Sequence, residues 1–445
     1  MADDPGQITA PGGSTGLLTD HYELTMLAGA LHSGAAQRRA VFEVFARQLP
    51  HGRRYGVVAG TGRLLDALEA FRFGPGELAF LRDTQVTDEA ALRYLESFAF
   101  TGDIWGYDEG DCYFPGSPIL VVEGTFAEAV VLETLVLSIL NHDCAIASAA
   151  SRMVTAADGR PLIEMGSRRT HELAAVASAR AAYIAGFATT SNLRAGRDYG
   201  VPTRGTSAHA FTLVHDSERD AFRAQLAVQG AGTTLLVDTF DVAGAVRAAV
   251  ELAGPDLGAV RIDSGDLAAT ARQVRTLLDG LGAHKTRIVL TGDLDEHSIA
   301  ALATAPVDGY GVGTALVTGS GAPTAALVYK LVARALEPGQ GAALQPVAKR
   351  SVGKPSRGGR KWALRQLDDS GTAVAEQVSL APPVPSPAGR ELLRPLVARG
   401  EIVRGQTLEQ ARQQHRDALA ELPGHALQLS RGYPAIPTLM EPGNG

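Results

Sequence analysis

The chain has 445 residues, of which 45% are hydrophobic and 20% are charged, proportions that exclude a disordered, collagenous or disulfide-stapled protein. Its 41 basic and 48 acidic residues give a formal net charge of −7, so the overall field favours neither nucleic acid backbones nor anionic membranes. The two cysteines, Cys112 and Cys144, can form at most one bridge, which predicts folding in a reducing, cytoplasmic compartment.

The N-terminal third predicts a loose tail followed by a mixed domain. Residues 1–16 are rich in Gly, Pro, Ser and Thr and are acidic where a signal peptide would be basic, so we expect a cytoplasmic tail there. Short helical and strand patterns alternate over residues 17–125. The apolar stretch 127–140 is interrupted by Glu128 and Glu133, which predicts a core helix and not a membrane span.

Between residues 161 and 317, short apolar runs alternate with longer segments of helical period, a pattern typical of repeated βα units. This pattern fits both a closed or nearly closed barrel and an open doubly wound sheet. We favour the barrel, because polar residues gather at the carboxyl ends of successive strands and no G-x-G-x-x-G turn follows the first strand. The expected strands are 161–166, 234–238, 259–263, 287–292 and 307–312, and the expected helices are 242–252, 267–281 and 294–303.

These patterns divide the chain into a tail and two domains. We predict an α/β barrel domain over 126–337 and an N-terminal α/β domain over 17–125 that is completed by residues 338–445. The C-terminal portion is rich in Gly, Pro and Gln, then basic, and ends with an amphipathic helix near residues 407–421.

The segment Arg261-Ile-Asp-Ser-Gly-Asp266 places a cation and acids at the end of an expected buried strand. Ser264 or Asp266 can cap the helix that follows, but a cap does not require Asp263. An acid at the carboxyl end of a barrel strand stands where an enzyme holds a ribose hydroxyl or a metal-bound water.

Three further segments are candidates for anion binding. The glycine-rich turn 308–318 offers backbone amides and the Thr314 hydroxyl to a phosphate, or is merely a tight βα turn. The pair Arg168 and Arg169 follows a strand and can grip a carboxylate or phosphate, or can form a solvated loop. His209 follows a Gly-Thr turn, where imidazole can serve as a nucleophile or general base.

Residues 349–365 contain seven basic residues and no acidic one. Such a run is usually a solvated face, although the interleaved glycines also suit a mobile loop that neutralises a polyphosphate. A nucleic acid partner is disfavoured, because the run contains one aromatic residue, Trp362, and the rest of the chain is acidic.

Taken in order, these motifs resemble the nicotinate phosphoribosyltransferases, members of the type II phosphoribosyltransferase family. The resemblance runs from about residue 17 to the C-terminal helix. The motifs that carry it are Thr19-Asp-His-Tyr-Glu-Leu-Thr25, Gly166-Ser-Arg-Arg169, Gly205-Thr-Ser-Ala-His209, Asp238-Thr-Phe-Asp241, Arg261-Ile-Asp-Ser-Gly-Asp266, Tyr310-Gly-Val-Gly-Thr314 and Lys349-Arg-Ser-Val-Gly-Lys354.

The resemblance implies an irregular α/β barrel that need not be complete, flanked by a mixed α/β domain, in a homodimer with sites at the subunit interface. It implies an enzyme that joins nicotinate to 5-phosphoribosyl 1-pyrophosphate for NAD biosynthesis and salvage, an ATP-coupled ligase with glycosyltransferase chemistry. Mg²⁺ is the implied cofactor and ATP the implied co-substrate, hydrolysed through a phosphate on His209. Neither nucleic acid nor membrane is an expected partner.

The resemblance also implies roles for individual residues. Tyr22, supported by Asp20, is expected to enter the site of the partner subunit and to stack on the pyridine ring. No metal ligand is assigned. The implied catalytic residues are His209, Asp263, Arg261 and Asp238; those for nicotinate are Tyr22, Arg168, Asp20 and Thr206; and those for the phosphoribosyl group and its phosphates are Gly292, Asp293, Gly313, Thr314 and Lys349.

Two positions bear on which pyridine is used. Met165 stands where related enzymes often have a second aromatic stacking partner, and its sulfur can still pack on a ring. Ser191 aligns with an aspartate of the nicotinamide-using relatives that would repel a carboxylate, which favours nicotinate. The alternatives are a nicotinamide phosphoribosyltransferase and a catalytically silent nucleotide-binding homologue; the presence of His209, Asp263 and Arg261 disfavours the second.

Overall fold

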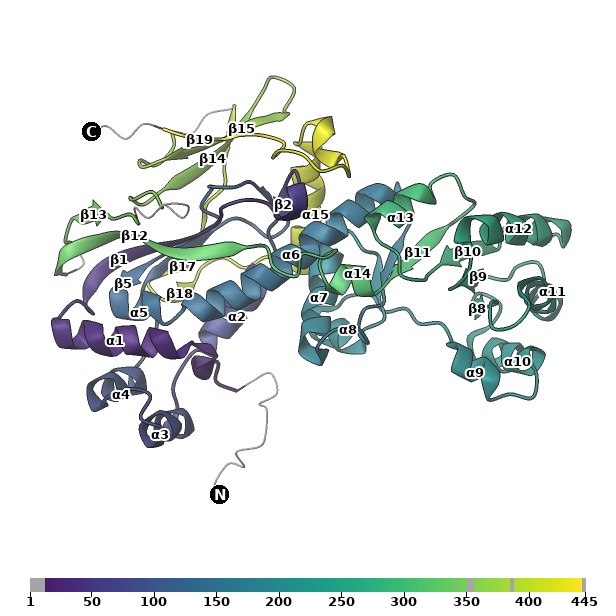
Figure 1. Ribbon diagram of the computed structural model, residues 1–445, viewed down its shortest axis with the longest axis horizontal. Helices are drawn as coiled ribbons and strands as arrows, with labels where there is room; N and C mark the ends of the chain where they lie inside the picture. Colours follow the sequence, from purple (N-terminus) through teal and green to yellow (C-terminus); the bar gives the residue numbers. More distant parts are fainter. Residues whose placement is uncertain (1–12, 340, 350–355, 385–387, 442–445) are drawn as a thin grey trace. The chain divides into compact units, whose positions relative to one another are not determined.

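The computed structural model describes residues 13–339, 341–349, 356–384 and 388–441 (Figure 1). They form two compact units. Unit 1 contains the described residues up to Ala145 and from Thr324 onward, and unit 2 is Ile146–Pro323. Most of the predicted tail, 1–16, and part of the predicted basic run, 349–365, lie outside the described residues.

Unit 1 is built on a seven-stranded antiparallel sheet in the order β13-β12-β1-β5-β3-β17-β18. The central strand β1 (Arg38–Ala46) pairs with β5 (Leu120–Thr125) on one side and β12 (Leu327–Pro338) on the other. The parts of unit 1 that precede and follow unit 2 in the chain therefore share one sheet. The last seven residues of β1 are buried, which explains why this strand reads as a nearly continuous apolar run.

The other strands of unit 1 are short. They are β2 (Gly56–Val57), β3 (Asp103–Gly106), β4 (Cys112–Tyr113), β13 (Leu344–Pro346), β14 (Trp362–Leu367), β15 (Ala373–Ser379), β16 (Gly389–Glu391), β17 (Arg394–Ala398), β18 (Glu401–Ile402) and β19 (Thr438–Met440). Strands β16-β14-β15-β19 form a second sheet and β2-β4 a small third one. Both cysteines are buried thiols that form no disulfide with each other, and burial raises the pKa of each.

The helices of unit 1 are α1 (His21–Ser33), α2 (Thr61–Glu69), α3 (Pro75–Asp83), α4 (Glu89–Glu96), α5 (Phe126–Val130) and α15 (Leu408–Ala420), and α6 (Glu133–Ala157) continues into unit 2. The predicted single helix over 127–140 is wrong in its bounds. Thr125 and Glu128 form a capping box that starts the short helix α5, and α6 begins afresh at Glu133. Within the described chain, none of the helices combines the length and apolarity that a bilayer crossing demands.

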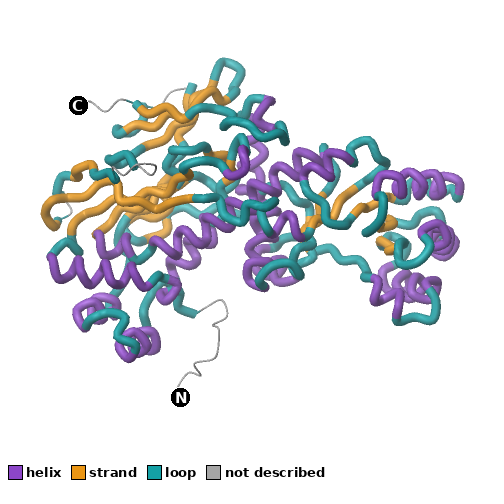
Figure 2. The backbone as a smooth tube through the Cα atoms, in the orientation of Figure 1, coloured by secondary structure: helices purple, strands orange, loops and turns teal. Residues whose placement is uncertain are grey.

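Unit 2 contains six parallel strands in the order β7-β6-β11-β10-β9-β8. Figure 2 shows the strands in orange and the helices in purple. Neighbours follow the chain from β8 to β11, and β11 then pairs with β6, which is the cyclic order of a barrel and not the reversed order of a doubly wound sheet. No ladder joins β7 to β8 within the described residues, so the ring is open there. The predicted fold class, an irregular and incomplete α/β barrel with a flanking α/β domain, is confirmed.

The strands of this half-barrel are β6 (Leu162–Glu164), β7 (Thr189–Thr190), β8 (Thr234–Leu236), β9 (Ala259–Ile262), β10 (Arg287–Leu290) and β11 (Gly309–Val312). The helices are α7 (Glu172–Ile184), α8 (Leu193–Tyr199), α9 (His209–Leu213), α10 (Glu218–Gln229), α11 (Val242–Ala253), α12 (Leu267–Gly280), α13 (Glu296–Ala301) and α14 (Thr314–Val317). Five strands and three helices match the predicted segments; β7 was not predicted.

Candidate active site

The carboxyl ends of the unit 2 strands carry most of the polar residues that the sequence singles out. Strand β8 leads into Asp238, β9 into Asp263, β10 into Gly292 and β11 into Gly313. Because parallel strands end at the same edge of a sheet, these residues gather at one rim of the half-barrel.

His209 stands between two of the acids. Its Nε2 lies 3.9 Å from Asp238 Oδ1 and 3.9 Å from Asp263 Oδ2. Its Nδ1 lies 3.1 Å from the Thr239 hydroxyl oxygen, so Thr239 fixes the ring orientation that turns Nε2 toward the carboxylates. The His209 side chain is 40% exposed, and a substrate can therefore reach it.

Arg261 connects the strand ends. Its Nε donates to the Thr291 hydroxyl at 3.0 Å, its Nη1 donates to the Thr206 hydroxyl at 2.7 Å, and its Nη2 lies 3.3 Å from Asp263 Oδ1. Burial raises the pKa of the Asp263 carboxyl, but the hydrogen bond from Thr291 and the charge of Arg261 outweigh burial and hold that pKa below its usual value. Asp263 is therefore a carboxylate at neutral pH.

Asp238 is the more buried acid, with a side chain that is 3% exposed. Its Oδ2 accepts the Asp263 backbone N–H at 2.8 Å and the Ser264 hydroxyl at 2.7 Å. Its Oδ1, which faces His209, is buried and has no hydrogen-bond partner among the described residues. A buried acceptor without a partner is uncommon in folded proteins and marks a position prepared for a ligand.

The same two carboxylates suit Mg²⁺ held jointly with a substrate. Mg²⁺ in phosphate-handling sites is commonly bound through one or two carboxylates plus substrate phosphates. No cluster of three or more His, Cys, Asp or Glu side chains that could hold a metal by itself occurs in the described parts of the chain. Asp238 and Asp263 therefore fit the implied ion as part of a shared coordination, with the remaining ligands supplied by phosphate oxygens and water.

The turn after β10 requires glycine. Gly292 has φ = 114°, and a Cβ there would collide with the backbone oxygen of Asp263. Asp293 also has a positive φ, 48°. Gly313 is the N-cap of α14, and Thr314 is the first residue of that helix. These residues lie at the same rim as Asp263, and their predicted phosphate-binding role stays a prediction.

Arg168 lies in the exposed loop that follows β6. This loop is anchored by Glu164, a residue the sequence analysis did not single out, whose buried carboxylate accepts the Gly166 N–H and the Thr190 hydroxyl. Burial raises the pKa of Glu164 above its usual value. Glu164 thus shapes the turn that presents Arg168.

Tyr22, Asp20 and Lys349 belong to unit 1, and their predicted place in a shared site stays a prediction. Asp20 is the N-cap of α1 but makes no side-chain capping bond. Tyr22 is 44% exposed, and its pKa is raised by burial and by the nearby carboxylate of Glu133. Lys349 is exposed, and its backbone N–H donates to the Ser356 hydroxyl at 2.9 Å.

The structure thus unites His209, Asp238, Asp263, Arg261 and Thr206 through direct contacts. It adds Thr239 and Thr291, which the sequence analysis missed. Thr239 directly follows Asp238 within a recognised motif, and Thr291 directly follows β10 at the rim, so position at a strand end was the available signal for both.

Comparisons with known proteins agree on one family. Residues 17–141 match the model described as the nicotinate phosphoribosyltransferase (NAPRTase) N-terminal domain. The chain is 61% identical over 433 residues to nicotinate phosphoribosyltransferase pncB1 of Mycobacterium tuberculosis, covering 95% of this chain and 94% of that protein. It is 37% identical over 329 residues to the nicotinate phosphoribosyltransferase of Bacillus subtilis, covering 72% and 67%. The crystal structure of human nicotinic acid phosphoribosyltransferase superposes with a TM-score of 0.81 at 25% identity, covering 95% and 97%.

Proposed function

Because the chain belongs to the nicotinate phosphoribosyltransferase family, we propose that it joins nicotinate to 5-phosphoribosyl 1-pyrophosphate, giving nicotinate mononucleotide and pyrophosphate for NAD biosynthesis. The observation that carries the proposal is the cluster of His209, Asp238, Asp263 and Arg261 at the rim of the half-barrel. Its chemistry suits the transfer of a phosphoribosyl group.

The acids of the cluster would act on the ribose. As the bond from C1 to pyrophosphate breaks, positive charge develops on the sugar, and the carboxylates of Asp238 and Asp263 stabilise such charge. The free Oδ1 of Asp238 can also accept a hydrogen bond from a ribose hydroxyl. The pyridine nitrogen of nicotinate is already a free nucleophile, so the enzyme's main task is to align it with C1.

The leaving pyrophosphate needs cations. Mg²⁺, bound through Asp238 or Asp263 and the phosphates, would supply charge neutralisation there. Arg168, on the loop anchored by Glu164, is free to meet the nicotinate carboxylate with a forked pair of hydrogen bonds. Gly292, Asp293, Gly313 and Thr314 are proposed to contact the ribose hydroxyls and the 5′-phosphate.

ATP coupling through His209 is the finer part of the proposal. His209 Nε2 would attack the γ-phosphorus of ATP, forming an N–P bond as the bond to the departing ADP oxygen breaks, and water would later release phosphate. The hydrogen bond between Nδ1 and Thr239 supports Nε2 as the nucleophile. Because Nε2 lies 3.9 Å from an oxygen of each carboxylate, a phosphoryl group on Nε2 would repel both acids, and this repulsion would couple phosphorylation to a rearranged site.

We also propose a homodimer in which Tyr22 and Asp20 of one subunit complete the nicotinate site of the other. Tyr22 supports this assignment, because it is a partly exposed aromatic side chain at the start of α1. The absence of a disulfide between the two buried cysteines is consistent with the cytoplasm as the proposed compartment.

A mass-resolved assay tests the reaction. The full chain is incubated with phosphoribosyl pyrophosphate and Mg²⁺, with either nicotinate or nicotinamide, and with or without ATP. We expect nicotinate mononucleotide, faster with ATP. Preference for the amide would make the chain a nicotinamide phosphoribosyltransferase, and no product from either pyridine would make it a silent homologue.

The variant His209→Ala tests the phosphohistidine separately. We expect it to lose stimulation by ATP while some uncoupled synthesis remains. His297→Ala, at an exposed position of α13, is the matched control and should behave as the wild type. Unchanged ATP dependence in His209→Ala would refute the phosphohistidine role and leave the transferase reaction standing.

A further inference from the structure

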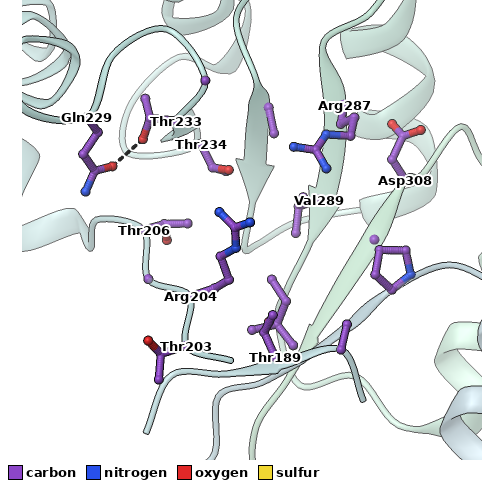
Figure 3. A pocket seen from close by; sticks show the side chains of 17 residues that line it. Thr189, Thr203, Arg204, Thr206, Gln229, Thr233, Thr234, Arg287, Val289 and Asp308 are labelled. Atoms are coloured by element: carbon purple, nitrogen blue, oxygen red, sulfur yellow. Dashed lines mark hydrogen bonds between the residues drawn. The ribbon is translucent and has the colours of Figure 1, made fainter. Parts of the chain in front are cut away.

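A cavity of about 650 Å³ lies at the amino ends of the unit 2 strands and reaches Thr206 at the edge of the catalytic cluster (Figure 3). Its lining includes Thr234, Ala259, Arg287 and Gly309, which are the first residues of β8, β9, β10 and β11. The catalytic acids instead follow the last residues of these strands. Small-molecule sites typically have volumes of about 300–1,000 Å³, so the cavity is large enough for a ligand of nucleotide size.

Two arginines give the cavity positive charge. Figure 3 shows the side chains of Arg204 and Arg287 pointing into it from different segments of the chain. Among the described residues, the Arg204 guanidinium makes no hydrogen bond or ion pair, and Arg287 donates only through Nε, to the Gly258 oxygen at 3.3 Å. Two guanidinium groups with free donors facing one space favour an anion between them.

The remaining lining limits the chemistry of the ligand. Thr234 adds a hydroxyl group on the side of Arg204, and donors that approach from several directions suit a phosphate better than a planar carboxylate. Ile163 and Val289 provide apolar wall for a ring. Asp308, whose carboxylate accepts the Ile288 N–H at 2.7 Å, offers acceptor oxygens for hydroxyl groups. Phosphate, sugar hydroxyls and a flat ring occur together in a nucleotide.

We propose that this cavity is a second ligand site, separate from the catalytic cluster, that binds a nucleoside 5′-monophosphate. The phosphate is held by Arg204 and Arg287, the sugar hydroxyls face Asp308, and the base packs on the apolar wall. The carboxylate of Asp308 disfavours a bare polyanion and selects a ligand that carries hydrogen-bond donors away from its phosphate.

The cavity is connected to the catalytic cluster by one residue. Thr206 lines the cavity, and its hydroxyl accepts the 2.7 Å hydrogen bond from Arg261, which in turn contacts Asp263. A ligand that binds the Arg204 side chain displaces the neighbouring segment that carries Thr206, and this displacement moves Arg261 through its hydrogen bond to Thr206. The site is therefore regulatory. This regulatory role rests on the proposed function, whereas the binding of a ligand in the cavity does not depend on that function.

Titration calorimetry of the full chain with adenosine 5′-monophosphate tests binding. Arg287→Ala removes one guanidinium and is expected to weaken binding by about tenfold or more. Arg272→Ala, on the exposed face of α12, removes the same charge from unit 2 and should stay within twofold of wild type. Asp263→Asn should also stay within twofold. Absence of binding to wild type, an unchanged affinity in Arg287→Ala, or loss of binding only in Asp263→Asn would overturn the proposal.

Steady-state kinetics tests regulation. The monophosphate should change the KM for phosphoribosyl pyrophosphate at least threefold in the wild type and not in Arg287→Ala, whose unfolding temperature should match that of the wild type. A KM that responds equally in both proteins would refute the regulatory connection. If no protein shows transferase activity, the proposed function fails, and calorimetry still decides whether the cavity binds a nucleotide.

Discussion

Replacing Arg261 by lysine keeps a positive charge at the end of β9 but removes the fork that joins three side chains and also donates to the Ser207 carbonyl oxygen at 3.2 Å. The guanidinium reaches the Thr291 hydroxyl at 3.0 Å, the Thr206 hydroxyl at 2.7 Å and Asp263 Oδ1 at 3.3 Å through three different nitrogens. A lysine ammonium is a single point on a flexible stem and can serve one of these positions well. Arg261→Lys therefore loses two of the three contacts.

The cost follows from the contacts and their burial. A hydrogen bond contributes about 1 kcal/mol net, and one that involves a charged group contributes about 1.5–3 kcal/mol. The Arg261 side chain is only 12% exposed, so water replaces the lost contacts incompletely. We expect the free energy of unfolding of unit 2 to fall by about 2 kcal/mol, which corresponds to about 4–8 °C in unfolding temperature for a unit of this size.

Arg261→Lys should also reduce activity, and by more than the loss of stability alone would cause, because Arg261 positions Asp263 at the proposed ribose site. We expect kcat/KM for phosphoribosyl pyrophosphate to drop by about 10²-fold or more. Thermal unfolding and initial rates of Arg261→Lys are compared with those of Arg272→Lys, whose side chain is exposed on α12. If Arg261→Lys unfolded within 1 °C of wild type and kept kcat/KM within threefold, the fork would not organise the site.

Three further outcomes are expected. Gly292→Ala forces a side chain onto a backbone with φ = 114°, and should lower the free energy of unfolding by about 3 kcal/mol, whereas Gly280→Ala, with open space around it, should not. Thr239→Val frees Nδ1 of His209 and should reduce stimulation by ATP about tenfold with uncoupled synthesis retained; equal losses in both rates would contradict a positioning role. Burial raises the pKa of Glu164, so its contribution to stability is present below its unfolded pKa of about 4.3 and is lost as pH rises through the folded value. Relative to wild type, Glu164→Gln should therefore gain stability in urea unfolding as the pH rises above about 4.3, and a relative loss would contradict the buried-acid argument.

The parallel strands could be predicted because strand burial leaves a short apolar run, as in 288–290, and because a polar residue follows that run. Strand β7 could not be predicted, since Thr189–Thr190 is two polar residues long and becomes a strand only by pairing with β6. For the same reason the position of the opening in the ring, which depends on which strands pair, is not encoded in any local pattern.

The residues of the candidate site likewise include some that the sequence could predict and some that it could not. The sequence could single out His209, Asp238 and Asp263 because they stand in motifs that together resemble one family, and contacts now join the three. Threonine is common in loops, and Thr239 and Thr291 acquire meaning only from the atoms beside their hydroxyls. Distances between residues far apart in the chain are set by tertiary packing, which the sequence pattern does not specify.

The catalytic cluster is acidic, so it does not by itself supply the cations that would neutralise a pyrophosphate. Glu218 adds a further acid near Asp238, and its pKa is raised by burial and by the negative charges of Asp241 and Asp238. An acidic rim of this kind stabilises developing positive charge on a ribose and repels a polyphosphate. The proposed reaction therefore needs cations beyond Arg261, and side chains elsewhere in the protein are candidates besides the proposed Mg²⁺.

Unit 1 contains cations that suit this need. A cavity of about 470 Å³ is lined by Arg47, Arg357 and Lys361, but Lys361 is already paired with Glu43 at 2.8 Å. Arg357 is exposed, and Arg47 Nε is buried without a hydrogen-bond partner, so these two remain for a ligand. If they serve the pyrophosphate of a site shared in a homodimer, Arg357→Gln should raise the KM for phosphoribosyl pyrophosphate about tenfold and leave that for nicotinate within twofold. Arg93→Gln, exposed on α4, is the control, and an equal effect of Arg357→Gln on both KM values, or none on either, would place the needed cations in unit 2 alone.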